Sequence, residues 1–183
     1  HFYISGSLAY DRIMNFPDRF SNHILPDKIH ILNVCFLVQD LEEKFGGTAG
    51  NIAYSFSLLQ EKPVLISQAG SDFQRYQSWL QKHGISLHGV RFLQEVPTAS
   101  AYITTDQADN QITAFNPGAM NFPTNGFFQD FQAKDSLAIV SPGNLEDMQQ
   151  FPNIYRELGL PFILDPGQNI PAFSGEQLKD MLQ

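Results

Sequence analysis

The chain has 183 residues, a formal net charge of −8, 43% hydrophobic residues and 16% charged residues. This length is enough for one domain with a substantial core, and the composition is that of a globular rather than a disordered chain. Because the charge is negative and Lys and Arg do not cluster, we expect no nucleic-acid partner. No apolar run is long enough to span a bilayer, and a single cysteine cannot form an internal disulfide. We therefore expect a soluble, cytoplasmic protein without a membrane partner.

Four short apolar runs end in small or turn-forming residues, a pattern that predicts buried strands. The runs are FYISGS, PVLISQAGS, LAIVSPG and PFILDPG, at residues 2–7, 63–71, 137–143 and 161–167. Helical patterns follow most of them; the first has Ile52, Phe56 and Leu59 at helical spacing. Strands that alternate with helices predict an α/β fold, with a mostly parallel sheet and helices on both of its faces.

The helix boundaries carry local signals. Ser71 with Gln74, and Ser174 with Gln177, have the spacing of a capping box, which predicts two helix starts. A further helix contains Pro152, and we expect this residue to divide it into two pieces.

Two segments do not follow the alternation of strands and helices. Residues 23–45 have no helical period and contain several β formers, and residues 100–116 have two alternating arms around a turn at residues 107–110. The second pattern is typical of a hairpin. We expect both segments to form a small second sheet, a lid.

The stretch KFGGTAGNIA, at residues 44–53, places glycines directly before a helix. A ligand can approach the backbone N–H groups of Gly46 and Gly47 closely, because glycine has no Cβ. Asn51 offers a donor and an acceptor, and Asp11 offers a carboxylate beyond the first strand. This combination suits a vicinal diol, whose hydroxyls both donate and accept. The alternative is that the glycines only allow close helix packing and that Asn51 caps the helix.

Several motifs resemble the ribokinase-like, or PfkB-type, carbohydrate and nucleoside kinases. GGTAGNIA resembles the family's first signature, and GSLAYD resembles its first strand with the substrate aspartate. TDQADNQITAFNPGAM resembles its lid hairpin and the following turn, and DPGQ resembles a later strand end in nucleoside-kinase-like members. The motifs occur in the family's order over nearly the whole chain. Among the branches, GGTAGNIAY together with NQITAF most resembles the adenosine-kinase-type members, and an apolar lid fits a purine.

The resemblance implies one ribokinase-like α/β domain over residues 1–183, with lid segments inserted at residues 23–45 and 100–116. It implies ATP-dependent phosphorylation of the hydroxymethyl group of an adenosine-like nucleoside or a sugar, with Mg²⁺, and a possible homodimer through the lid. By the same resemblance, the substrate hydroxyls are held by Asp11, Gly46, Gly47 and Asn51, flanked by Ser7 and Thr48. The far end of the substrate is covered by Tyr102, Ile112 and Ala114, with Asn116 nearby. Ordinary strand packing is the alternative for these lid residues.

The family's catalytic aspartate lies in a Gly-Ala-Gly-Asp turn, which this sequence does not contain. We expect that turn, and the metal-associated and adenine-binding segments, beyond Gln183, so that the C-terminal portion is absent here. Asp106, Asp109 and Asp165 are interpreted as two turn residues and a strand-end residue rather than as bases. We expect no metal site within the chain. The alternative is a half-length protein that binds a nucleoside or sugar without phosphorylating it.

Overall fold

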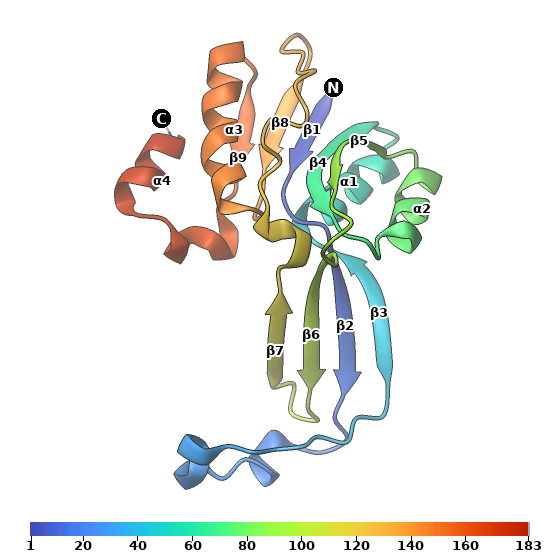
Figure 1. The fold of residues 1–183 in the computed structure, drawn as a ribbon, viewed down its shortest axis with the longest axis vertical. Coiled ribbons are helices and arrows are strands. Elements are labelled where there is room, and N and C mark those ends of the chain that lie inside the picture. Colours follow the sequence, from blue (N-terminus) through green and yellow to red (C-terminus); the bar gives the residue numbers. More distant parts are fainter. Residues whose placement is uncertain (183) are drawn as a thin grey trace.

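The computed structural model describes residues 1–182. In these residues the main sheet has five parallel strands in the order β5-β4-β1-β8-β9 (Figure 1). The strands are β1 (Phe2–Ser5), β4 (Pro63–Ala69), β5 (Ser86–Phe92), β8 (Leu137–Val140) and β9 (Phe162–Leu164). The four predicted strands are confirmed, and β5 is an additional strand at the edge of the sheet.

Helices cover both faces of the main sheet, as predicted (Figure 1). Ile4 and Leu65 pack on one face with α1 (Thr48–Leu58) and α2 (Gln74–Lys82). Their strand neighbours Tyr3 and Ile66 pack on the other face with α3 (Leu145–Leu158) and α4 (Gly175–Leu182). Successive strand residues point to opposite faces, so each strand serves both cores. None of the helices in residues 1–182 is both long and apolar enough to cross a membrane.

Only one of the two predicted capping boxes forms. At the start of α4 the Gln177 N–H donates to Ser174 Oγ at 3.2 Å, and the Ser174 N–H donates to Gln177 Oε1 at 2.8 Å. At the start of α2 the N-cap is Phe73 and no side chain caps the helix. The Ser71 hydroxyl donates instead to the Val96 carbonyl, at 3.4 Å. A tertiary contact has replaced the local one.

Pro152 does not divide its helix. α3 is continuous with Pro152 inside it, which corrects the expectation of two pieces. The helix begins at a strong cap, because Asn144 Oδ1 accepts from the N–H groups of Glu146 and Asp147 at 3.0 and 3.2 Å. Met148, Phe151 and Tyr155 are buried against the sheet together with Pro152 itself. Burial of this apolar stripe stabilises the helix despite the backbone hydrogen bond that proline cannot make.

A second, four-stranded sheet extends from the carboxyl ends of the main strands (Figure 1). Its order is β3-β2-β6-β7, with β2 parallel to β6 and the other pairs antiparallel. The strands are β3 (Leu41–Gly46), β2 (Ala9–Asn15), β6 (Ala99–Thr105) and β7 (Gln111–Asn116). The predicted hairpin is thus confirmed.

The contribution of residues 23–45 to this sheet is smaller than expected. Only β3 is a strand there, and the chain before it contains the 3-10 helices Phe20–Asn22 and Pro26–Ile31. The strand that completes the sheet is β2, which follows β1 almost directly in the sequence. The first apolar run therefore forms β1 alone, and the chain turns after it at Gly6–Leu8 and continues as β2 of the second sheet.

Candidate functional site

A cavity of about 580 Å³ lies where the second sheet meets the carboxyl ends of β1 and β8. Parallel α/β sheets bind their ligands at this edge, and the volume suits a small molecule. Its lining comprises Ser7, Ala9, Asp11, Gly47, Thr48, Asn51, Ala101, Phe115, Pro117, Met120, Pro142, Gly143, Gln168 and Asn169. Five of the ten predicted site residues are among them: Ser7, Asp11, Gly47, Thr48 and Asn51.

Gly46 and Gly47 lie where a larger side chain would overlap neighbouring atoms. Gly46 is not among the residues that line the cavity, but a Cβ on it would overlap the carboxylate of Asp11. Gly47 has φ +87°, a conformation that favours glycine, and a Cβ there would lie 2.7 Å from the Ala9 backbone nitrogen. The paired glycines therefore allow β2, with its aspartate, to pass directly beside the start of α1.

Asp11 presents an unused acceptor. Its side chain is half-buried on β2, and within residues 1–182 its carboxylate has no hydrogen bond or ion pair. Lys44 lies opposite on β3 but pairs with Glu42 at 3.2 Å. Burial raises the pKa of Asp11, because the charged form loses hydration without gaining a partner. A half-buried carboxylate without a partner is suited to accept hydrogen bonds from a ligand.

Asn51 lies in the first turn of α1, where its backbone N–H donates to the Gly47 carbonyl at 3.0 Å. The N-cap of α1 is Gly47, and no side chain caps the helix. The interpretation of Asn51 as a cap is therefore contradicted. Its exposed carboxamide lines the cavity, with both a donor and an acceptor available.

Ser7 and Thr48 line the cavity and are joined by hydrogen bonds. The Thr48 N–H donates to Ser7 Oγ at 3.0 Å, and Thr48 Oγ1 donates to the Pro142 carbonyl at 2.6 Å. The Ser7 N–H donates in turn to the Pro142 carbonyl, at 3.0 Å. These bonds join the end of β1, the start of α1 and the end of β8, so both hydroxyls hold the backbone around the cavity.

The predicted lid residues lie on the face of the second sheet that points away from the cavity. Ala101 and Phe115 are paired across β6 and β7, and both line the cavity. Their neighbours Tyr102 and Ala114 are also paired, so they occupy the opposite face, and Ile112 shares that face by alternation. A shift of one residue along a strand exchanges the two faces. The lid residues that reach the cavity, Ala101 and Phe115, are therefore sequence neighbours of the predicted residues Tyr102 and Ala114.

Asn116, the remaining predicted residue, lies at the end of β7, where its Oδ1 accepts from the Gly118 N–H at 3.1 Å. It shapes the turn that precedes the 3-10 helix Gly118–Asn121. Asn116 is not part of the cavity lining, but the residue after it, Pro117, is.

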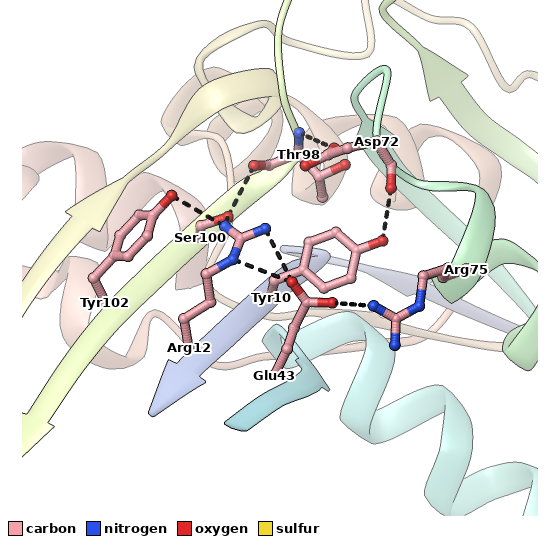
Figure 2. A network of polar contacts seen from close by, with 8 residues as sticks. All are labelled: Tyr10, Arg12, Glu43, Asp72, Arg75, Thr98, Ser100 and Tyr102. Atoms are coloured by element: carbon pink, nitrogen blue, oxygen red, sulfur yellow. Dashed lines mark hydrogen bonds and ion pairs between the residues drawn. The ribbon is translucent and has the colours of Figure 1, made fainter. Parts of the chain in front are cut away.

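Tyr102 belongs to a polar network on the outer face of the second sheet (Figure 2). Arg12 donates to Ser100 Oγ at 2.6 Å and to Tyr102 Oη at 3.1 Å, and its Nε donates to Glu43 at 3.1 Å. Glu43 also pairs with Arg75 of α2 at 2.8 Å. The network joins β2, β3 and β6 of the second sheet to α2, which packs on the main sheet.

Asp106 and Asp109 lie in a turn and Asp165 follows a strand, as the sequence analysis interpreted them. Asp106 is buried in the β6–β7 turn and accepts from the N–H groups of Phe20 and Asn110, both at 2.9 Å. Burial opposes the charge, but these bonds outweigh it and lower the pKa of Asp106 to about 2. Asp109 has φ +58° in the same turn, and Asp165 follows β9. Within residues 1–182, no group of three or more His, Cys, Asp or Glu is placed to hold a metal ion.

Two polar cavity residues were missed by the sequence analysis. Gln168 and Asn169 lie in the 3-10 helix Gly167–Ala172 that follows β9. Their position in the sequence could have identified them, because they come directly after DPG at a predicted strand end. The carboxyl ends of parallel strands gather at one edge of the sheet, where ligands bind.

Comparison with known proteins agrees with this architecture. Residues 8–169 match the family described as pfkB family carbohydrate kinase. The chain belongs to the pfkB family. The nucleoside kinase of Methanothermobacter thermautotrophicus is 27% identical over 150 residues, which are 80% of this chain and 48% of that protein. The chain spans about half the length of the curated relatives that it matches.

Solved structures of nucleoside kinases have the same fold. The Burkholderia thailandensis nucleoside kinase in complex with inosine is 41% identical, with a TM-score of 0.82, over 100% of this chain and 57% of that one. A structure of the same protein in complex with ADP-inosine is 43% identical, with a TM-score of 0.77 and the same coverage. The nucleoside kinase of Methanocaldococcus jannaschii, described as an archaeal member of the ribokinase family, has a TM-score of 0.82 at 24% identity over 99% of this chain and 57% of that one. The predicted ribokinase-like fold is confirmed.

Proposed function

We propose that the protein carrying this chain is a kinase that transfers the γ-phosphoryl group of ATP to the hydroxymethyl group of a purine nucleoside. The observation that carries this proposal is the half-buried Asp11 carboxylate, which has no partner within residues 1–182 and shares one cavity with the carboxamide of Asn51. A carboxylate and an amide can together bind the two hydroxyls of a ribose diol. Membership of the pfkB family supports the reaction class.

The apolar part of the cavity supports a nucleoside rather than a bare sugar. Ala101, Phe115, Pro117, Met120 and Pro142 supply carbon surface beside the polar residues. A purine has flat faces that gain from such contacts, whereas a sugar exposes hydroxyls on most sides. The B. thailandensis kinase, which binds inosine, is similar over the whole of this chain.

The residues of this chain bind and orient the acceptor nucleoside. Phosphoryl transfer also needs a group that positions or deprotonates the attacking hydroxyl, donors for the transferred phosphoryl group, and usually Mg²⁺. Residues 1–182 offer no cluster of metal ligands, so we assign to them no part in holding Mg²⁺. The complex of the B. thailandensis kinase that contains ADP supports ATP as the donor. Use of ATP also fits the cytoplasmic location expected from the sequence.

The test is to measure binding and phosphorylation of inosine, adenosine and ribose, first with the unmodified protein. Asp11→Asn and Asn51→Ala should each weaken nucleoside binding by about 1–3 kcal/mol, or roughly fivefold to 150-fold, because a hydrogen-bonding partner of the ligand is lost. Asp180→Asn, on the exposed side of α4, is the matched control and should bind normally.

Two results would contradict the proposal. If both cavity variants kept their affinity, the glycine stretch and its neighbours would serve packing alone. If ribose were bound and phosphorylated but the nucleosides were not, the substrate would be a sugar.

We also propose that the protein forms a homodimer through the lid, at the segment that connects β2 to β3. The segment that connects β2 to β3 lies far from the main sheet (Figure 1). Its exposed apolar side chains are Leu25, Ile29, Ile31, Leu32 and Leu37. Apolar side chains gathered in this way favour an interface. Light scattering should give twice the monomer mass, and Leu37→Lys should reduce it, whereas Leu59→Lys at the exposed residue after α1 should not. A monomer at all accessible concentrations would exclude the dimer.

A further inference from the structure

The cavity has a second polar wall, formed after β9 by Gln168 and Asn169. The half-buried side chain of Asn169 is held in place from two sides. Its Nδ2 donates to the Gly143 carbonyl at 3.1 Å and lies 3.2 Å from the Sδ of Met148, a buried residue of α3. The carboxamide is therefore fixed before any ligand arrives.

The orientation of this carboxamide decides what it can offer. Its nitrogen must face the Gly143 carbonyl, because two carbonyl oxygens would repel each other. A carboxamide nitrogen has two hydrogens, and the two contacts to Gly143 and Met148 account for both. The group that remains for a ligand is the Oδ1 oxygen, which is an acceptor only.

The two polar walls lie on different sides of the cavity. Asp11 comes from the second sheet and Asn51 from α1, next to the end of β1. Asn169 follows β9, which is separated from β1 by β8 in the main sheet. Two strand spacings are roughly 10 Å, so the side chains of the two walls can reach opposite ends of one small ligand.

A ligand that satisfies both walls must bring hydrogen-bond donors at two ends. Asp11 and Asn169 Oδ1 are both acceptors, so each needs an O–H or N–H from the ligand. A nucleoside has such donors in its ribose diol and in its hydroxymethyl group. With the diol at Asp11 and Asn51, the hydroxymethyl O–H is the donor that remains on the sugar.

We propose that Asn169 Oδ1 accepts a hydrogen bond from the hydroxymethyl hydroxyl of the bound nucleoside and so orients the oxygen that is to be phosphorylated. This inference rests on the proposed function. The amide oxygen is not basic enough to remove the proton, so Asn169 positions the hydroxyl and does not act as the base.

The experiment combines a change in the protein with a matched change in the ligand. Dissociation constants are measured for inosine and for 5′-deoxyinosine, which lacks this hydroxyl, with the protein as it is encoded. The same pair is measured with Asn169→Leu and with Asn169→Ala. Asn153→Leu, on the exposed side of α3, is the control for the substitution itself. Thermal unfolding shows that each variant is folded.

We expect the unmodified protein and the control to bind inosine about fivefold to tenfold more tightly than 5′-deoxyinosine, which corresponds to one hydrogen bond. In both Asn169 variants this preference should disappear, because only inosine loses a partner. A merely structural role would weaken both ligands equally and leave their ratio unchanged, and that result would overturn the inference while leaving the proposed function intact. If the unmodified protein bound no nucleoside, the proposed function would fail, and this inference with it.

Discussion

At the scale of single residues, the Asp11 carboxylate is a local cost to stability. Its carboxylate loses hydration in the folded protein, and its pKa is raised for that reason. Without a ligand, no hydrogen bond within residues 1–182 compensates this loss. Under the proposed function, a ligand with two hydroxyls would supply the missing donors.

The stability of Asp11→Asn should therefore depend on pH in a defined direction. The raised pKa means that the folded state binds the proton more tightly than the unfolded state. The carboxylate therefore destabilises the folded protein at pH values above its folded-state pKa. Below its unfolded-state pKa of about 4, the group is protonated in both states and has no such effect. Calorimetry should show a higher Tm for Asp11→Asn at pH 7, and this gain should shrink as the pH falls toward about 4. Asp180→Asn should show no such trend, and a lower Tm for Asp11→Asn at pH 7 would reveal a stabilising partner for the carboxylate.

At the scale of elements, α1 and α2 approach each other closely at Gly50. A Cβ on Gly50 would overlap the hydroxyl of Tyr76, which is buried and donates to the Gly46 carbonyl at 2.9 Å. Tyr76 therefore has little freedom to move. The third glycine of GGTAGN serves helix packing, and through Tyr76 it supports the strand end beside Asp11.

Gly50→Ala tests this contact. Alanine normally favours a helix by about 1 kcal/mol over glycine, but the overlap with Tyr76 should cost more and give a net loss of about 1–3 kcal/mol. Chemical denaturation measures the change in the free energy of unfolding. Gly175→Ala, at a helical glycine with open space around it, is the control and should be neutral or stabilising. A stabilised Gly50→Ala would mean that Tyr76 moves aside easily.

At the scale of the whole molecule, the network around Glu43 connects the second sheet to α2, a helix that packs on the main sheet (Figure 2). Its two arginines differ in environment. The Arg12 side chain is 21% exposed and the Arg75 side chain is 74% exposed. An exposed ion pair contributes little, whereas a largely buried charge that loses its partner is costly.

We therefore expect Glu43→Ala to lower the free energy of unfolding by about 1–3 kcal/mol and Arg75→Ala to lower it by less than about 1 kcal/mol. High salt should diminish the small effect of Arg75 and leave most of that of Glu43. Urea unfolding with and without salt checks both values. Equal losses in the two variants would mean that the contact to α2, rather than the partner of Arg12, stabilises the network.

The sequence by itself determined the features that repeat locally. Alternating apolar runs and helical periods predicted the main strands and helices, and the glycine stretch with Asp11 and Asn51 predicted one side of the cavity. Each of these signals is contained in a few consecutive residues, so the local sequence is enough to recognise it.

Only the tertiary structure decided the features that depend on distant partners. The pairing of β2 with β6 determined that Ala101 and Phe115, not Tyr102, Ile112 and Ala114, face the cavity. Burial against the sheet kept α3 whole at Pro152, and the neighbouring strands β8 and β9 brought Asn169 to the cavity wall. A strand has the same local pattern whichever way its faces point, so the register with a neighbour that is remote in sequence determines which side chains reach the ligand.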